Sequence, residues 1–277
     1  MKHLLSLAIA LGALAYVAFA GPAHADDKVG IVLMHGKQGA PLGNAPIGSN
    51  RPPLGGRLID DLKSAGYLVE TPEMCWSGRR GLDRAYAQCL REVDDAVENL
   101  RRHGATSIVV GGLSQGGNAA IAYGATHRDI LGVIAYGPAD DPVAKARVPA
   151  VAASIAKAQD MMSRGNGSEK ASFDDVNTGP NGSFTMTLNT TASIYLSFYG
   201  PDALTVIAVN TAKLKVPVLW VAGDKDPSQR GGPAAAFDKA PANALNRYVI
   251  VPATHTETPN AGSDATLAWL KDLTSTQ

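Results

Sequence analysis

The chain alternates short apolar runs with longer amphipathic stretches over most of its length. Runs rich in Val, Ile and Leu that are bounded by Gly, Pro or Asp are typical of buried strands. Stretches in which apolar residues recur every three or four positions predict helices between these runs. We expect strands near 29–34, 67–71, 107–113, 130–136, 217–222 and 247–251. We expect helices at 54–65, 81–102, 115–126 and 263–273.

This alternation favours the α/β class, with a mostly parallel, twisted sheet of about six strands and helices on both faces. The chain has 277 residues, of which 45% are hydrophobic and 18% are charged. A chain of this size can bury one sizeable core, so we expect one domain over residues 26–277. The 25 basic and 25 acidic residues give a formal net charge of zero. Because no basic stripe is present, we exclude nucleic acid as a partner.

The connection between two of the expected strands is too long for a single crossover helix. We therefore expect a lid-like insertion at about 140–205. Its first part, 142–164, is alanine-rich and predicts a helix, whereas 165–182 has the composition of a loop. The part from 184 to 199 alternates polar and apolar residues and ends in aromatic side chains. Of these, Tyr195 and Tyr199 either line an acyl pocket or pack the insertion onto the sheet.

Residues 1–25 form a different kind of sequence and predict a signal peptide. A basic start precedes the apolar run 4–20, and Ala23-His24-Ala25 offers small residues where a signal peptidase reads them. We expect cleavage before Asp26 and export to a periplasm or beyond, without a stable membrane anchor afterwards. The alternative is a transmembrane anchor, which the missing basic stop-transfer flank disfavours.

Export also favours a disulfide between the two cysteines, because thiols in an oxidising compartment tend to pair. Cys75 and Cys89 are the only two in the chain, so we expect them to form a disulfide. This bond would fix the loop after the second strand onto the helix at 81–102. Two thiols without matching histidines disfavour a zinc site, and we expect neither a metal nor a cofactor.

One serine stands where a strand turns sharply into a helix. In Gly112-Leu-Ser114-Gln-Gly116, glycines flank Ser114 at the points where a side chain would collide with neighbouring backbone. This arrangement is a nucleophile elbow. A serine hydroxyl needs a base to take its proton, and the base needs an acid to fix its tautomer.

Both partners are offered downstream, each just past an expected strand. Asp226 is the expected acid, with Asp224 as its rival, and His255 is the expected base. The order Ser, Asp, His along the chain resembles that of the α/β-hydrolase superfamily, and in particular of its exported serine esterases and lysophospholipases. The resemblance implies a reduced version of that fold and a spacing that favours Asp226 over Asp224.

The superfamily also stabilises the oxyanion with two main-chain N–H groups. The resemblance assigns the first to Gln115 and the second to the loop after the first strand, where Lys37 is preferred and Gln38 is a close rival. His35 in that loop is expected to be structural. Trp76 and its neighbours Arg79 and Arg80 follow the second strand and are tentative substrate-binding residues.

The resemblance implies a serine hydrolase that cleaves a small-molecule carboxylic ester. A peptidase or amidase of the same fold is the first alternative, and Arg79, Arg80 or Asp224 would then bind a substrate terminus. A non-catalytic exported binding protein is the second alternative. It is disfavoured because a complete Ser, Asp and His set would serve no purpose. The oligomeric state, the acyl length and the leaving group stay open.

Overall fold

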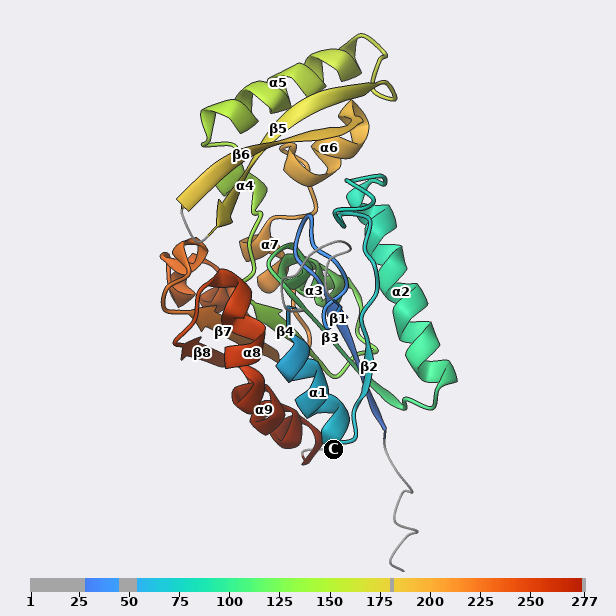
Figure 1. The fold of residues 1–277 in the computed structure, drawn as a ribbon, viewed down its shortest axis with the longest axis vertical. Coiled ribbons are helices and arrows are strands. Elements are labelled where there is room, and N and C mark those ends of the chain that lie inside the picture. The colour runs from blue at the N-terminus through green and yellow to red at the C-terminus, as the bar shows by residue number, and fades with distance from the viewer. Residues whose placement is uncertain (1–27, 45–53, 180–181, 276–277) are drawn as a thin grey trace, which may run out of the picture.

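The computed structural model describes residues 28–44, 54–179 and 182–275. Its centre is a six-stranded parallel sheet with the strand order β2-β1-β3-β4-β7-β8 (Figure 1). The expected α/β class and parallel sheet are therefore confirmed. The strands of this sheet are β1 (Val29–Met34), β2 (Leu68–Glu70), β3 (Ser107–Leu113), β4 (Gly132–Tyr136), β7 (Val218–Gly223) and β8 (Arg247–Val251).

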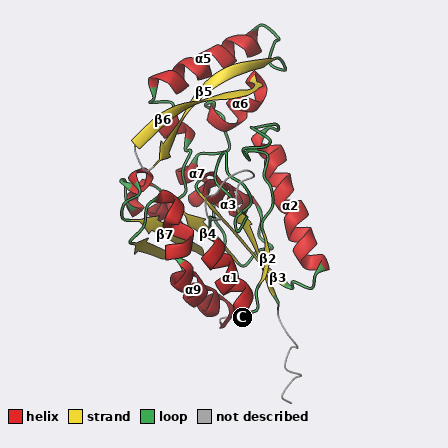
Figure 2. Ribbon diagram, viewed as in Figure 1, coloured by secondary structure: helices red, strands yellow, loops and turns green. Residues whose placement is uncertain are grey.

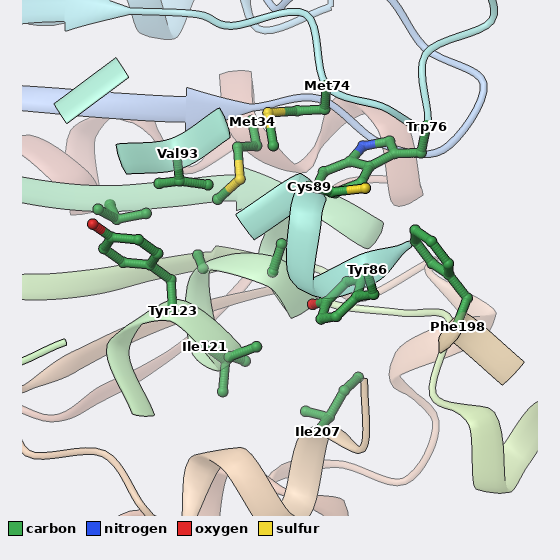
Figure 3. Packing of buried hydrophobic residues seen from close by; sticks show 14 of the residues in the cluster. Met34, Met74, Trp76, Tyr86, Cys89, Val93, Ile121, Tyr123, Phe198 and Ile207 are labelled. Atoms are coloured by element: carbon green, nitrogen blue, oxygen red, sulfur yellow. The ribbon is translucent and has the colours of Figure 1, made fainter. Parts of the chain in front are cut away.

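Helices cover both faces of the sheet, because successive strand residues point to opposite sides. In β1, Val32 and Met34 join the core beneath α2 and α3, whereas Ile31 and Leu33 join the core beneath α1 and α9. Figure 3 shows Met34 in the first of these cores, together with Val93 of α2 and Ile121 of α3. The bounds of these helices are α1 (Gly56–Ser64), α2 (Tyr86–Arg102), α3 (Gln115–Thr126) and α9 (Ser263–Ser275).

The connection from β4 to β7 forms a separate layer at one end of the molecule (Figures 1 and 2). It contains an antiparallel hairpin of two strands, against which α5 and α6 pack. Its elements are α4 (Pro142–Lys145), α5 (Pro149–Ser163), β5 (Lys170–Gly179), β6 (Gly182–Thr191), α6 (Ala192–Tyr199) and α7 (Ile207–Thr211). The insertion contacts α2 through the Phe198 ring, which lies edge-on to Tyr86 with 5.1 Å between centroids (Figure 3).

The hairpin corrects the expectation of a loop at 165–182. Phe173 and Leu188 are paired across β5 and β6, and both are buried in the same core as α5. The other face of the hairpin is partly exposed, so its Asn, Ser, Asp and Thr residues give the sequence the composition of a loop. The expected helix in 142–164 is confirmed as α4 and α5, with a break between them.

Several short elements were not expected from the sequence. They are α7, α8 (Thr258–Ala261) and single turns of 3-10 helix at Pro227–Gln229, Pro233–Ala235, Phe237–Lys239 and His255–Glu257. The expected signal peptide at residues 1–25, with cleavage before Asp26, lies outside the described residues. In the described part of the chain, no helix has both the length and the apolar character needed to cross a membrane.

Candidate active site

Ser114 occupies a strained turn between β3 and α3. Its φ of 59° and ψ of −117° lie in a region that non-glycine residues rarely adopt, at a cost of about 1–3 kcal/mol. The main-chain N–H of Ser114 donates to the Tyr136 carbonyl at 2.9 Å, which helps to hold the turn. A Cβ at Gly112 would lie 2.5 Å from the Gly116 backbone, and one at Gly116 would lie 2.5 Å from the Met34 carbonyl oxygen. The two glycines are therefore required by close backbone contacts on both sides of Ser114.

Asp226 and His255 meet at the same edge of the sheet. Asp226 follows β7 and His255 follows β8, and Asp226 Oδ2 lies 2.6 Å from His255 Nδ1. The other carboxylate oxygen of Asp226 accepts the main-chain N–H of Ser228 at 2.9 Å and its hydroxyl at 2.7 Å. Burial opposes ionisation of Asp226, but the hydrogen bonds from His255 and Ser228 outweigh it and hold the pKa of this carboxyl below its usual value. The carboxylate is therefore kept ionised beside the imidazole.

The rival aspartate has a different partner. Asp224 Oδ1 accepts the main-chain N–H of Ala253 at 3.0 Å, and the main-chain N–H of Asp224 donates to the Val251 carbonyl at 2.9 Å. These bonds fasten the loop after β7 to the chain that leads to His255. Of the two aspartates, Asp226 is the one that contacts the imidazole, and Asp224 supports the loop.

Ser114 and His255 line one cavity of about 860 Å³ at the carboxyl ends of the strands. Ser114 is 9% exposed, so little of it is open to solvent. None of the described residues forms a hydrogen bond with the Ser114 hydroxyl, which is therefore available to a bound substrate. Hydrogen bonds between a nucleophile and its base are often long before substrate binds.

The loop after β1 lies against the serine. A Cβ on Gly36 would be 3.7 Å from Ser114 Oγ, so this loop and the serine are neighbours. The main-chain N–H of Gln38 donates to the Trp76 carbonyl at 2.8 Å and is occupied. The main-chain N–H groups of Lys37 and Gln115 have no acceptor among the described residues. The geometry therefore favours Lys37 over Gln38 as a donor to a bound oxyanion, with Gln115 as the second donor.

His35 braces this loop from below. Its Nε2 accepts the main-chain N–H of Met74 at 3.0 Å, and its Nδ1 donates to the Gly36 carbonyl at 2.7 Å. These partners select a neutral ring, and burial lowers the pKa of the His35 imidazole, which agrees with that state. The Trp76 indole N–H donates to the His35 carbonyl at 2.9 Å. His35 and Trp76 are both fully engaged in holding the loop.

The segment that carries Trp76 is itself fixed by a disulfide. Cys75 and Cys89 are bonded, with 5.6 Å between their Cα atoms, so the loop after β2 is joined to α2. Figure 3 shows Cys89 and Trp76 side by side in the core. The expected disulfide therefore indirectly supports the loop after β1.

Three aromatic residues that were expected to bind substrate do not line the cavity. Trp76, Tyr195 and Tyr199 are each at most 1% exposed. Tyr195 stacks on Phe173 of the hairpin with 4.6 Å between ring centroids, so it packs the insertion. The cavity is lined instead by apolar side chains that sequence reasoning did not single out: Val143, Val148, Val206, Ile207, Trp220 and Ala236. They come from four separate segments, and nothing in the sequence connects those segments.

Arg79 and Arg80 also lie away from the cavity. Arg79 forms an ion pair with Glu73, and Arg80 forms ion pairs with Asp83 at 2.9 Å and Glu92 at 2.6 Å. The Arg80–Glu92 pair braces the loop after β2 against α2, and the other two pairs lie within the loop, which explains two adjacent arginines without a ligand. Among the described residues, no group of three or more His, Cys, Asp or Glu side chains is arranged to hold a metal ion.

A buried cluster of charges borders the cavity and was not expected. Lys37 Nζ lies 2.6 Å from Asp140 Oδ1 and also pairs with Asp175. Lys145 Nζ lies 2.8 Å from Asp140 and 2.9 Å from Asp175, so two cations share two carboxylates. Burial opposes ionisation of Asp140, but the two ammonium groups outweigh it and hold its pKa far below the usual value. Tyr199 completes the cluster by donating to Asp175 Oδ2 at 3.1 Å.

No protein-family model matches the sequence, and no curated protein is significantly similar to it. Solved structures do match in fold. A structure reported with the metagenome-derived lipolytic enzymes LipS and LipT superposes with a TM-score of 0.61 at 16% identity, over 89% of this chain and 94% of that chain. A monoacylglycerol lipase from Paleococcus ferrophilus gives a TM-score of 0.61 at 20% identity, over 88% and 94% of the chains. The α/β hydrolase GrgF from Penicillium sp. gives 0.60 at 16% identity, over 90% of each chain. The chain therefore has the α/β-hydrolase fold.

Proposed function

We propose that this protein is an exported serine hydrolase that cleaves small-molecule carboxylic esters through Ser114, His255 and Asp226. The observation that supports the proposal most strongly is the Asp226–His255 pair, which is joined at 2.6 Å and borders the cavity that contains Ser114. A strained serine, an imidazole and an ionised, buried carboxylate at one cavity form the set that acyl transfer requires.

In the proposed reaction, Ser114 Oγ attacks the ester carbonyl while His255 Nε2 takes its proton. Asp226 holds the proton on His255 Nδ1, so that Nε2 is left free to act as the base. The main-chain N–H groups of Lys37 and Gln115 donate to the oxygen on which negative charge develops. His255 then returns the proton to the leaving alcohol oxygen. A water molecule, deprotonated by His255, hydrolyses the acyl-enzyme and restores the Ser114 hydroxyl.

An ester is favoured over an amide for two reasons. The cavity walls near Ser114 are mainly apolar, which suits an acyl chain. Arg79, Arg80 and Asp224, which were expected to bind a substrate terminus in a peptidase, have other partners and do not line the cavity. The fold neighbours include lipolytic enzymes and a monoacylglycerol lipase, which also supports an ester substrate.

The decisive test is hydrolysis of p-nitrophenyl esters from acetate to palmitate by the wild type and by Ser114→Ala. We expect a rate that peaks at one acyl length and falls to the background level in the variant. A fluorophosphonate should label Ser114 in the wild type, as peptide mass spectrometry would show. A protein that hydrolyses no ester and takes up no label would contradict the proposal and favour a binding protein. Cleavage of an amide substrate alone would favour the peptidase.

Export is tested separately, by the mass of the protein that a host delivers outside its cytoplasm. We expect a mature chain that starts at Asp26. A chain that keeps residues 1–25 would show that the apolar run is an anchor and not a cleaved signal.

A further inference from the structure

The buried charge cluster joins the loop after β1 to the insertion. Lys37 belongs to that loop, Asp140 follows β4, Lys145 ends α4 and Asp175 belongs to β5 of the hairpin. The Lys37 side chain is 1% exposed, and those of Asp140 and Asp175 are 3% and 0% exposed. The two positive and two negative charges of the cluster balance. Such a network is stable only when each charge keeps its partners, so the four side chains hold one another in place.

Lys37 differs from the other members because it belongs to the loop beside Ser114 and lines the same cavity although its side chain is buried. Its ammonium group is bound by Asp140 and Asp175, and it also donates to the Tyr199 hydroxyl at 3.3 Å. Its main-chain N–H has no acceptor among the described residues. The residue before it, Gly36, lies against Ser114. The side chain and the main chain of Lys37 thus point to two different parts of the protein, the insertion and the cavity.

We propose that Lys37 is a positioning residue. The ion pairs of its ammonium group with Asp140 and Asp175 fix its main-chain N–H at the oxyanion site. Asp175, a hairpin residue that does not line the cavity, then affects the acylation rate without touching the substrate. This inference rests on the proposed serine hydrolase. It gives a reason for burying a lysine beside the nucleophile, where a small residue would supply the same N–H group.

A purely structural cluster would have different consequences. In that case any cluster member would lower stability when it is removed, and activity would fall only with the amount of folded protein. The structure offers a matched comparison, because Lys145 contacts the same two carboxylates but belongs to α4 and not to the loop after β1. Lys37→Met and Lys145→Met each remove one cation from the cluster. Only Lys37→Met also removes the ion pairs that hold the proposed oxyanion donor in place.

The experiment measures the rate at which a fluorophosphonate labels Ser114, together with kcat and KM for p-nitrophenyl acetate. The variants are Lys37→Met, Lys145→Met and Lys157→Met. Lys157 is an exposed residue of α5 that lies outside the cavity and donates to the Ser172 carbonyl of the hairpin, not to the charge cluster. We expect Lys37→Met to lose about 100-fold in labelling rate and kcat, because a donor displaced by about 1 Å loses most of its effect, with little change in KM. Lys145→Met should lose similar stability but less than about tenfold in either rate. Lys157→Met should match the wild type.

A folding defect in Lys37→Met does not remove the test. The double variant Lys37→Met with Asp175→Asn removes one cation and one anion, which leaves Lys145 and Asp140 as a neutral pair. We expect it to fold and to show the same loss of kcat as Lys37→Met.

Three results would overturn the inference. A folded Lys37→Met or double variant that is labelled at the wild-type rate shows that the N–H is positioned without the side chain. Equal losses in Lys37→Met and Lys145→Met show that the cluster acts through stability alone. In both cases Ser114→Ala still abolishes labelling and the proposed function stands. A wild type that takes up no label refutes the proposed function itself, and the inference with it.

Discussion

Replacement of Asp226 by Asn tests the proposed triad, because the structure fixes which way the new amide would face. In the wild type, Oδ1 of Asp226 accepts two hydrogen bonds from Ser228, from its N–H and from its hydroxyl. In Asp226→Asn these two donors retain the carbonyl oxygen, so the NH₂ group faces His255 Nδ1 at the position of Oδ2. His255 Nδ1 must then accept, and the ring proton moves to Nε2. The imidazole keeps its place but cannot take a proton from Ser114.

We expect kcat for an ester substrate to fall by about ten-thousandfold, a barrier increase of about 5.4 kcal/mol, as for a triad with the wrong tautomer. Stopped-flow or long-time assays with p-nitrophenyl butyrate measure the residual rate. Asp224→Asn is the matched control, since its amide oxygen can still accept the Ala253 N–H, and it should retain most of the activity. If Asp226→Asn retains more than about a tenth of kcat, or if Asp224→Asn is the inactive variant, the assignment of the acid is refuted.

Three further predictions concern stability. In Gly116→Ala, the new Cβ would lie 2.5 Å from the Met34 carbonyl oxygen, so we expect a loss of about 1–3 kcal/mol in the free energy of unfolding and a lower kcat. A variant as stable and as active as the wild type would contradict the close backbone contacts at the elbow. Removal of the disulfide by Cys75→Ser with Cys89→Ser should cost about 3 kcal/mol, measured by urea unfolding, because the two cysteines lie 14 positions apart along the chain. The pKa of Asp140 is lower in the folded than in the unfolded chain, so its stabilising effect is complete above about pH 4 and is lost as pH falls towards the folded-state pKa. The difference in unfolding free energy between the wild type and Asp140→Asn should therefore be constant at neutral pH and shrink between about pH 5 and pH 3. A difference that stays constant down to pH 3 would show that folding does not lower the pKa of Asp140.

The central sheet could be predicted from the sequence because its strands are buried on both faces. Such strands appear as continuous apolar runs, as in β1 and β3. The elbow could be predicted because its glycines are required by local backbone contacts. The pairing of Asp226 with His255 followed from their positions after two strands that a parallel sheet places next to each other. Each of these features depends on local pattern or on chain order.

The insertion and the cavity walls could not be predicted in the same way. The hairpin exposes one polar face, so Asp174 and Asn177 in β5 look like loop residues until β6 is paired with them. The charge cluster depends on contacts between Lys37 and Asp175, which are far apart along the chain, and a lysine and an aspartate are ordinary surface residues in any sequence. Tyr199 looked like a pocket residue because its aromatic character is visible and its hydrogen bond to Asp175 is not.

The loop after β1 is held from two sides, and this arrangement connects stability with the proposed chemistry. On one side, the disulfide-bound segment fixes it through the Gln38 N–H, which donates to the Trp76 carbonyl, and through His35. On the other side, Asp175 of the insertion holds the Lys37 side chain. A serine hydrolase gains from such bracing, because an oxyanion donor is effective only when it is already in place as charge develops. Asp175→Asn should therefore reduce kcat although Asp175 does not line the cavity, whereas a substitution of the exposed Ser172 in the same strand should not.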